Sequence, residues 1–289
     1  MDRIKDDMLI AEVSKRFDEN RIAIANLRTM TKNLEAVNEK LRQSESLKSD
    51  FLSNIRNEII NPLASILGLA RQIVDRGPDA RTAQEMAAAI HREAFDLDFQ
   101  MRNIFTAAEL EAGDAALSVA NTDVAALIRS LIAAFEHKAA EKRVTVAFDC
   151  RGCAGGTLSF KTDPDKLQKV LANLLANAIE FNLEGKQVFI AAGRDGERLT
   201  VSIRDEGTGI PEKDRKKVFD RFVQLETGVR KRHRGHGLGL SITKALAELL
   251  GGTVTLTGEE GAGCVFTVSI IEQEAGHDVG VLSGDGNEF

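Results

Sequence analysis

Two asparagines in the segment DPDKLQKVLANLLANAIEFN, Asn173 and Asn177, have the spacing and chemistry of a small metal site. Residues four apart lie on the same face of a helix, so both amides point to one side. Amide oxygens are hard, neutral ligands, and Mg²⁺ is commonly held by few protein oxygens together with substrate phosphates. The alternative is that both asparagines cap or bridge neighbouring loops. The pair therefore indicates a Mg²⁺ site only if phosphates bind beside it.

A carboxylate followed by glycines forms a second candidate site, in the segment RDEGTGIPEKD. Asp205 ends an apolar stretch, and Gly207 and Gly209 follow it. Glycines let the backbone approach a ligand closely, and a carboxylate accepts hydrogen bonds from an amino group such as that of a purine. A tight turn after a strand would explain the same residues.

A third candidate site is the segment RGHGLGLSI, in which glycine recurs at every second position. Its site positions are Gly235, His236, Gly237, Leu238 and Gly239. Free N–H groups at the start of a helix, without side chains in the way, bind anions. The basic run RKRHR just before it suits a mobile lid over a triphosphate, although such runs are more often solvated loops.

Short, β-branched, turn-bounded stretches predict the strands that position these residues. We expect strands at VTVAFDC, TLSF, KQVFIAAG, RLTVSIRD, GTVTLTG and CVFTVSII. Helical stretches are expected between them, at 122–141, 164–181 and 238–250. Helices interspersed with a mixed sheet predict an α/β two-layer sandwich.

The pattern before residue 113 is helical throughout. Apolar residues recur in alternating steps of three and four, which is typical of a coiled-coil seam; they are Ile10, Val13, Phe17, Ile24, Leu27, Met30, Leu34, Val37 and Leu41. A single amphipathic helix lying on its own domain is the alternative. The turn RGPD at 76–79 separates this helix from a second one at about 81–111. The apolar stripes of an antiparallel hairpin need a partner, so we expect a homodimeric four-helix bundle.

Composition narrows the classes of function. A chain of 289 residues has room for two domains, and a net charge of -6 gives no reason to expect nucleic-acid binding. Because no apolar run is long enough to span a membrane, we expect a cytoplasmic chain or the cytoplasmic part of a larger sensor. Three cysteines indicate a reducing compartment rather than a disulfide framework. Cys150 and Cys153 are interpreted as a strand end and turn, in preference to a zinc or redox site.

In order and spacing, these segments resemble the N, G1, F and G2 boxes of the histidine-kinase ATP-binding domain, which is shared more loosely with gyrase, Hsp90 and MutL. The segment VFDRFVQLETGVRKRHR supplies the F box, and GEEGAGCVFTVSI is similar to the closing glycine box and strand. The resemblance covers about residues 40–272. It implies a Bergerat-type sandwich and the cofactors ATP and Mg²⁺.

The resemblance also implies roles for single residues. Asn177 corresponds to the Mg²⁺ ligand, with Asn173 beside it. Phe181 lines the adenine, Asp205 accepts from the adenine amino group, and Arg221 reaches the phosphates together with the 235–239 loop. Hydrolases of the wider superfamily have a glutamate where Asn173 stands. An amide cannot take a proton from water, so futile ATP hydrolysis is disfavoured.

Two positions depart from the family pattern. The usual lysine three residues after the Mg²⁺ asparagine is Glu180, and the usual threonine or serine at 236 is His236. A carboxylate that points toward triphosphate oxygens is repulsive, whereas an imidazole N–H is able to donate to phosphate. These departures leave the nucleotide affinity open.

The segment RNEIINPL, residues 56–63, resembles the family's dimerisation and phosphoacceptor motif, in which a histidine precedes the glutamate. Asn57 stands at the acceptor position, Arg56 replaces a serine and Ile60 replaces an arginine. A carboxamide nitrogen has its lone pair delocalised into the carbonyl, so Asn57 cannot accept a phosphoryl group. Three unusual residues favour natural degeneration over a single engineered change, which stays an alternative. Glu58 and Asn61 match the motif, and in relatives the position of Asn61 orients water for dephosphorylation of a response regulator.

The sequence therefore predicts four regions: a coiled-coil signalling helix at 1–48, a phosphoacceptor-like hairpin at 49–113, an ATP-binding domain at 114–272 and a flexible tail at 273–289. We expect a two-component histidine-kinase core that binds Mg-ATP, engages a response-regulator receiver domain and does not autophosphorylate. Retained phosphatase activity is one reading. A pseudokinase scaffold and an acceptor variant of an active kinase are the alternatives.

Overall fold

The structure is a computed structural model that describes residues 21, 26–35, 37–39, 42, 59–153, 155–224 and 237–273. The chain separates into two units, 1–53 and 54–289. The described residues of the first unit are helical, and four positions of the predicted seam are exposed on them: Leu27, Met30, Leu34 and Val37. The other seam positions lie outside the described residues, so the coiled coil stays a prediction.

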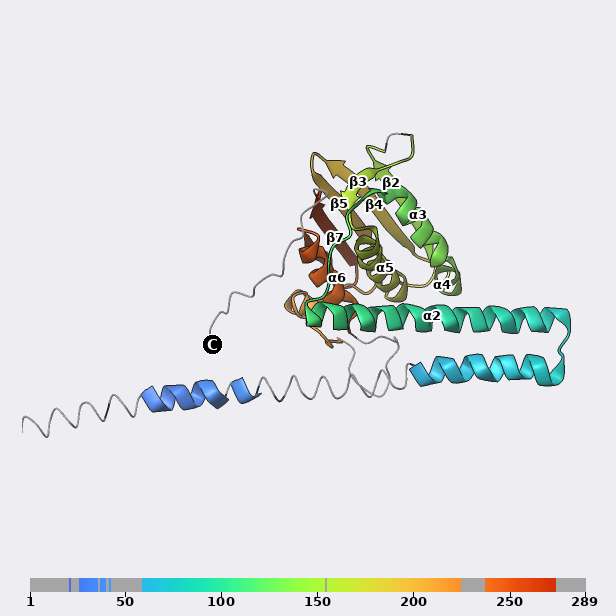
Figure 1. The fold of residues 1–289 in the computed structure, drawn as a ribbon, viewed down its shortest axis with the longest axis horizontal. Helices are drawn as coiled ribbons and strands as arrows, with labels where there is room; N and C mark the ends of the chain where they lie inside the picture. The colour runs from blue at the N-terminus through green and yellow to red at the C-terminus, as the bar shows by residue number, and fades with distance from the viewer. Residues whose placement is uncertain are drawn as a thin grey trace, which may run out of the picture. The chain divides into compact units, whose positions relative to one another are not determined.

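The second unit begins with a helical hairpin (Figure 1). Its first described helix covers residues 59–76, and α2 follows as Ala80–Ala112. The side chain of Asp79 caps α2 by accepting hydrogen bonds from the N–H groups of Arg81 and Thr82, both at 3.0 Å. Gly113 ends the helix in the left-handed conformation with φ 75°, as the sequence predicts. None of the described helices is long and apolar enough to cross a membrane.

The hairpin leaves much of its apolar surface uncovered in a single chain. Large apolar side chains are exposed along it, namely Ile60, Leu63, Leu67, Val74, Met101 and Phe105. Thr106 is the one residue of α2 that is fully buried. A surface of this kind supports the expected need for a partner, and the dimeric four-helix bundle stays a prediction.

An α/β two-layer sandwich follows the hairpin and confirms the predicted fold class (Figure 1). Its main sheet has the order β2-β4-β5-β7-β6, formed by Thr145–Arg151, Gln187–Asp195, Arg198–Arg204, Gly263–Ile271 and Thr253–Glu259. The β2–β4 pair is parallel and the other pairs are antiparallel, so the sheet is mixed as expected. Three helices pack on one face of it: α3 (Val124–Ala134), α5 (Pro164–Glu180) and α6 (Gly239–Leu249). Two short 3₁₀ helices, Glu212–Asp214 and Lys217–Phe219, lie between β5 and α6.

The helix predicted at 122–141 is wrong in its extent. Residues Ala120–Asp123 form β1, which pairs with β3 (Ser159–Thr162) in a separate two-stranded sheet. The side chain of Asp123 accepts hydrogen bonds from the N–H groups of Ala125 and Ala126, which fixes the start of α3. The helix then breaks at buried Phe135, and α4 covers Glu136–Glu141.

The core of the sandwich is built around α5. Pro164 occupies its first turn, where no N–H partner is needed. Apolar residues at helical spacing are almost fully buried on one side: Leu167, Val170, Leu171, Leu174, Leu175, Ala178 and Ile179. They face the sheet, in which β5 contributes alternating buried residues such as Val201. This stripe leaves the other side of α5 available for its asparagines.

Contacts also join α2 to the sandwich. Phe95 and Phe99 of α2 pack edge-to-face against Phe135, with ring centroids 5.4 and 5.6 Å apart. The ammonium group of Lys138 lies 2.8 Å from the Asp96 carboxylate. Further along α2, the Nδ2 of Asn103 donates to the Oδ1 of Asn173 at 2.8 Å. The hairpin thus reaches a residue that the sequence assigns to the nucleotide site.

The buried carboxylate of Asp163 should stabilise the start of α5 measurably. It accepts from the backbone N–H of Lys166 at 3.0 Å and from that of Ser118 at 2.8 Å, and its Oδ2 lies 2.8 Å from the Lys166 ammonium. Burial alone would raise the pKa of Asp163, but these hydrogen bonds hold it below its usual range. We expect Asp163→Asn to lower the free energy of unfolding at neutral pH by about 1–3 kcal/mol.

The pH dependence follows from the sign of that shift. Because the pKa of Asp163 is lowered in the folded protein, its contribution is present above the unfolded pKa and is lost as pH falls through the folded pKa. Urea unfolding at neutral and acid pH should show the wild-type advantage shrinking on acidification. Asp165→Asn is the matched control, since Asp165 is exposed in the same helical turn. An equal loss in both variants would contradict the role of Asp163.

Candidate functional site

Asp205, which directly follows β5, is a buried carboxylate with only 5% of its surface exposed. Its Oδ1 accepts from the N–H of Gly207 at 2.9 Å and from that of Cys264 at 3.1 Å. Burial raises the pKa of Asp205, and these two hydrogen bonds only partly offset that effect. In the described part of the chain, its Oδ2 has no hydrogen-bond partner. The carboxylate therefore keeps one oxygen for a ligand donor.

Glycines let three segments meet around this carboxylate. A Cβ on Gly207 would collide with the carbonyl oxygen of Phe181, at the end of α5. Gly209 has φ +69°, and a Cβ there would collide with the carbonyl oxygen of Glu259, at the end of β6. The loop after β5 therefore lies directly against the end of α5 on one side and the β6–β7 turn on the other.

Asn182 joins the end of α5 to the loop after β5, and it was not among the residues predicted from the sequence. It is 6% exposed, and its Oδ1 accepts from the N–H groups of Leu183 at 3.0 Å and Glu206 at 3.1 Å. Its Nδ2 is buried without a partner in the described residues. Position 182 directly follows Phe181, and a polar residue two positions past the end of an apolar helix is the only signal that could have found it.

The two asparagines of α5 have different surroundings. Asn173 is 2% exposed and already accepts a hydrogen bond from Asn103, while its Nδ2 is buried without a partner among the described residues. Asn177 is half-buried, and its backbone carbonyl accepts from the N–H of Phe181 at 2.9 Å. Asn177 therefore has the more available amide oxygen of the pair.

The described end of the glycine segment lies beside Asn173. Gly237 has φ +67°, and its carbonyl accepts from the N–H of Phe222 at 3.0 Å. Buried Leu238 is the N-cap of α6 and gives that helix no side-chain cap. A side chain at Gly239 would touch the Asn173 amide. The first N–H groups of α6 thus start next to the asparagine face of α5.

Two further predicted residues, Phe181 and Arg221, and the departing residue Glu180 lie around this region. Phe181 is 43% exposed at the end of α5. Arg221 is exposed, with its Nη1 4.0 Å from the Glu111 carboxylate of α2. The carbonyl of Glu180 accepts a hydrogen bond from the ammonium of Lys142, so a cation lies at the last turn of α5 although residue 180 is acidic.

Several predicted positions lie outside the described residues: Asn57, Glu58, Gly235 and His236. Asn61 is described and is exposed within the helical residues 59–76, next to buried Pro62. The structure therefore describes most of the predicted nucleotide-binding residues, but of the predicted residues in the acceptor-like motif it describes only Asn61.

The residues present fit a nucleotide carrying Mg²⁺. Asp205 would hold an adenine amino group, the glycines would let the ligand approach the backbone, and the N–H groups at the start of α6 would face phosphates. Asn177 would supply an amide oxygen to the metal. The buried, unpartnered amide nitrogens of Asn173 and Asn182 are further donors at the two ends of this region.

Comparisons with known proteins agree with this geometry. Residues 162–274 match the family described as "Histidine kinase-, DNA gyrase B-, and HSP90-like ATPase". The chain is 32% identical over 232 residues to the circadian input-output histidine kinase CikA of Synechococcus elongatus. The matched region covers 80% of this chain but only 31% of CikA. It therefore spans less than a third of that relative.

Solved structures share the fold. Full-length ShkA in complex with AMPPNP matches with a TM-score of 0.56 and 27% identity, over 78% of this chain and 46% of ShkA. The histidine kinase ThkA in complex with response regulator protein TrrA matches with a TM-score of 0.51 and 24% identity, over 80% of this chain and 64% of ThkA. In a chain similar to histidine kinases over about four fifths of its length, residues 162–274 thus form a histidine kinase-, DNA gyrase B- and HSP90-like ATPase domain.

Proposed function

We propose that this chain is a two-component histidine-kinase core that binds Mg-ATP and engages a response regulator but does not phosphorylate itself. The observation that carries the nucleotide part is the buried Asp205 carboxylate, held through one oxygen by two backbone N–H groups. A charged acceptor in a glycine-lined site suits an adenine base, and the N-terminus of α6 elsewhere in the same domain suits its phosphates. Mg²⁺, when bound, would neutralise phosphate charge.

The lack of self-phosphorylation rests on Asn57. The nitrogen of a carboxamide is a hydrogen-bond donor and not a nucleophile, so no phosphoryl group transfers to it. His91 is the one histidine within the described hairpin, and it is exposed on α2. The response regulator is proposed as the partner because the 56–63 segment resembles the family's dimerisation and phosphoacceptor motif, which the phospho-aspartate of a regulator would have to approach. The structural neighbour ThkA, whose fold this chain shares, is in complex with such a protein.

The first test concerns Asp205. Asp205→Asn should weaken Mg-ATP binding by about 1–3 kcal/mol, because an amide replaces the charged acceptor. Isothermal titration measures the affinity, with Asp195→Asn at the exposed end of β4 as the control. The ligand-free variant should unfold at the same temperature as the wild type or higher, because a buried charge has been removed. An affinity within a factor of two of wild type would remove Asp205 from the site.

The second test concerns Asn57. With radiolabelled ATP the chain should take up no acid-labile label, and Asn57→His should restore labelling if the nucleotide site is competent. Light scattering on the same samples should give the mass of a homodimer, since the exposed apolar residues of the hairpin need a partner. Acid-labile label on the wild-type chain would contradict the proposal. Mg-ATP binding without label in Asn57→His would favour the pseudokinase scaffold.

The third test concerns Asn61. We propose that its exposed amide orients water at the phospho-aspartate of the regulator, so the chain should accelerate loss of phosphate from a cognate regulator. Asn61→Ala should abolish this acceleration while leaving regulator binding intact. Gln72→Ala is the matched control, because Gln72 is an exposed amide three turns further along the same helix face. Equal decay with and without the protein would leave the scaffold function alone.

A further inference from the structure

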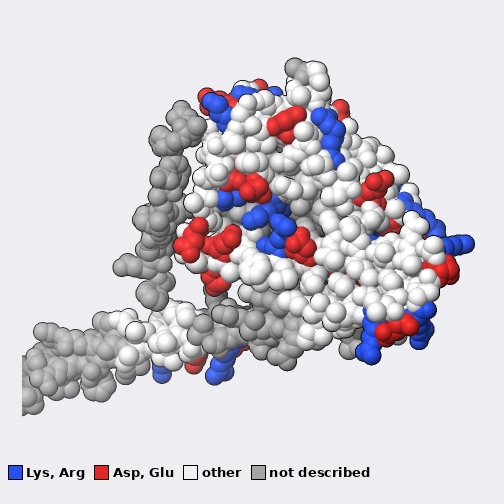
Figure 2. All heavy atoms as spheres, turned by 45° about the vertical axis from the view of Figure 1, so that its right-hand side comes forward, with Lys and Arg blue, Asp and Glu red and all other residues white. Residues whose placement is uncertain are grey.

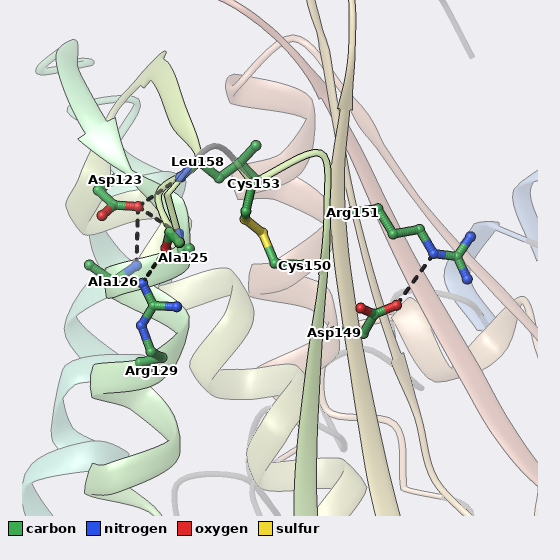
Figure 3. The surroundings of a disulfide bond; sticks show 10 residues. Asp123, Ala125, Ala126, Arg129, Asp149, Cys150, Arg151, Cys153 and Leu158 are labelled. Atoms are coloured by element: carbon green, nitrogen blue, oxygen red, sulfur yellow. Dashed lines mark hydrogen bonds and ion pairs between the residues drawn. A yellow bond between two sulfur atoms is a disulfide. The ribbon is translucent and has the colours of Figure 1, made fainter.

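Cys150 and Cys153 form a disulfide at the end of β2 (Figure 3). This corrects the expectation that the cysteines are not disulfide-bonded, while the predicted strand end and turn are confirmed. Gly152, with φ 78°, turns the chain so that the two Cα atoms lie 5.7 Å apart, within the usual range for disulfides. The sequence could not indicate the bond because a zinc site, a redox pair and a turn share the C-x-x-C spacing.

Other interactions already hold the loop that follows the disulfide. The Oδ1 of Asp123 accepts from the N–H of Leu158 at 3.1 Å, and the N–H of Val124 donates to the Leu158 carbonyl at 2.9 Å. Arg129 of α3 donates to the carbonyl of Gly156 at 2.6 Å. A disulfide between residues three apart closes a very short loop, so it constrains the unfolded chain little. The bond is therefore not needed as a structural staple.

The position of the pair favours access by external thiols. β2 is an edge strand of the main sheet, and both cysteines are only half-buried. Figure 3 shows the charged side chains of Asp149 and Arg151 on the other side of β2 from the sulfur atoms. Within the described residues, no group of three metal-ligating side chains exists that would make the pair a metal centre.

The third cysteine provides an internal contrast. Cys264 is 5% exposed, and burial together with the neighbouring Asp205 carboxylate raises the pKa of its thiol to about 11. A thiol of this kind stays protonated and reacts poorly. The chain thus combines one inert cysteine with one accessible C-x-x-C pair, the spacing found in dithiol redox pairs.

We propose that Cys150 and Cys153 are a reversible dithiol–disulfide couple that exchanges with external thiols. A thiolate attacks one cysteine sulfur, forms a mixed disulfide and releases the other cysteine as a thiolate, which takes up a proton. A second external thiolate attacks the external sulfur of the mixed disulfide and releases the first cysteine, which is also protonated. Two external thiols are oxidised to one disulfide, and the protein disulfide is reduced by two electrons to two thiols.

This couple is separate from the nucleotide site. Cys150 pairs with Ala192 toward the end of β4, whereas Arg204, the residue before Asp205, pairs with Phe189 near the start of β4. The two sites therefore lie toward opposite ends of the sheet. Disulfide exchange should leave Mg-ATP affinity unchanged, so the redox proposal stands or falls independently of the proposed function.

The test equilibrates the full chain in mixtures of reduced and oxidised dithiothreitol, followed by alkylation and peptide mass spectrometry. Labelling of Cys150 and Cys153 should fall together as the mixture becomes more oxidising, along the curve of a two-electron couple. Cys264 should be labelled only in denaturant, and Cys264→Ser should leave the curve unchanged. Cys153→Ser should convert Cys150 into a residue that forms a mixed disulfide with glutathione.

Two outcomes would overturn the proposal. One is full labelling of both cysteines at the most oxidising ratio, which would show that the folded chain does not form the bond. The other is reduction only after unfolding, which would show a structural disulfide closed to external thiols. A melting temperature nearly equal in the two redox states supports the proposal, because the Asp123 and Arg129 interactions hold the loop in both.

Discussion

The burial of the Asp205 carboxylate is the constraint on which the candidate site depends. A buried carboxylate is stable only when hydrogen bonds replace water, and here the described donors to it are two backbone N–H groups. Those donors belong to the loop after β5 and to β7, so both segments must approach the carboxylate within hydrogen-bond distance. The collisions that a side chain at Gly207 or Gly263 would cause follow from the same requirement. In Figure 2, basic and acidic side chains are interspersed over the face shown. The described charges on that face therefore form no single large patch of one sign, and a ligand is inferred from the Asp205 site instead.

Much of this arrangement is local and could be predicted from sequence. Strands and helices of the sandwich follow from alternation and helical spacing, as in β5 and α5, because each buries one face. Asp205 and the glycines after it could be identified from residue type alone. A carboxylate directly after an apolar strand and glycines that allow close backbone approach are both visible in the sequence. The helix expected at 122–141 failed because the capping carboxylate of Asp123 and the packing of Phe135 override helical propensity there.

Long-range pairings carry no such signal. The hydrogen bond between Asn103 and Asn173 joins residues 70 positions apart, and neither residue type indicates the other. The same holds for the ion pair of Lys138 with Asp96 and for the hydrogen bond between Asn182 and Glu206. The hydrogen bond from Asn103 decides how available the Asn173 amide oxygen is, so the difference between Asn173 and Asn177 could not be obtained from their spacing. The structure makes Asn173 a link between α2 and the start of α6, and leaves Asn177 only half-buried.

The proposed absence of a phosphoacceptor at position 57 does not by itself imply that nucleotide binding is lost. The raised pKa of Asp205 means that its charge is less favourable in the folded chain than in the unfolded one, so the carboxylate lowers the stability of the ligand-free protein. An amide at this position would accept the same two backbone hydrogen bonds without that cost. A residue that opposes folding and leaves one oxygen open is explained by a ligand that uses the oxygen. The physical chemistry of Asp205 therefore supports the proposal that this domain binds a nucleotide.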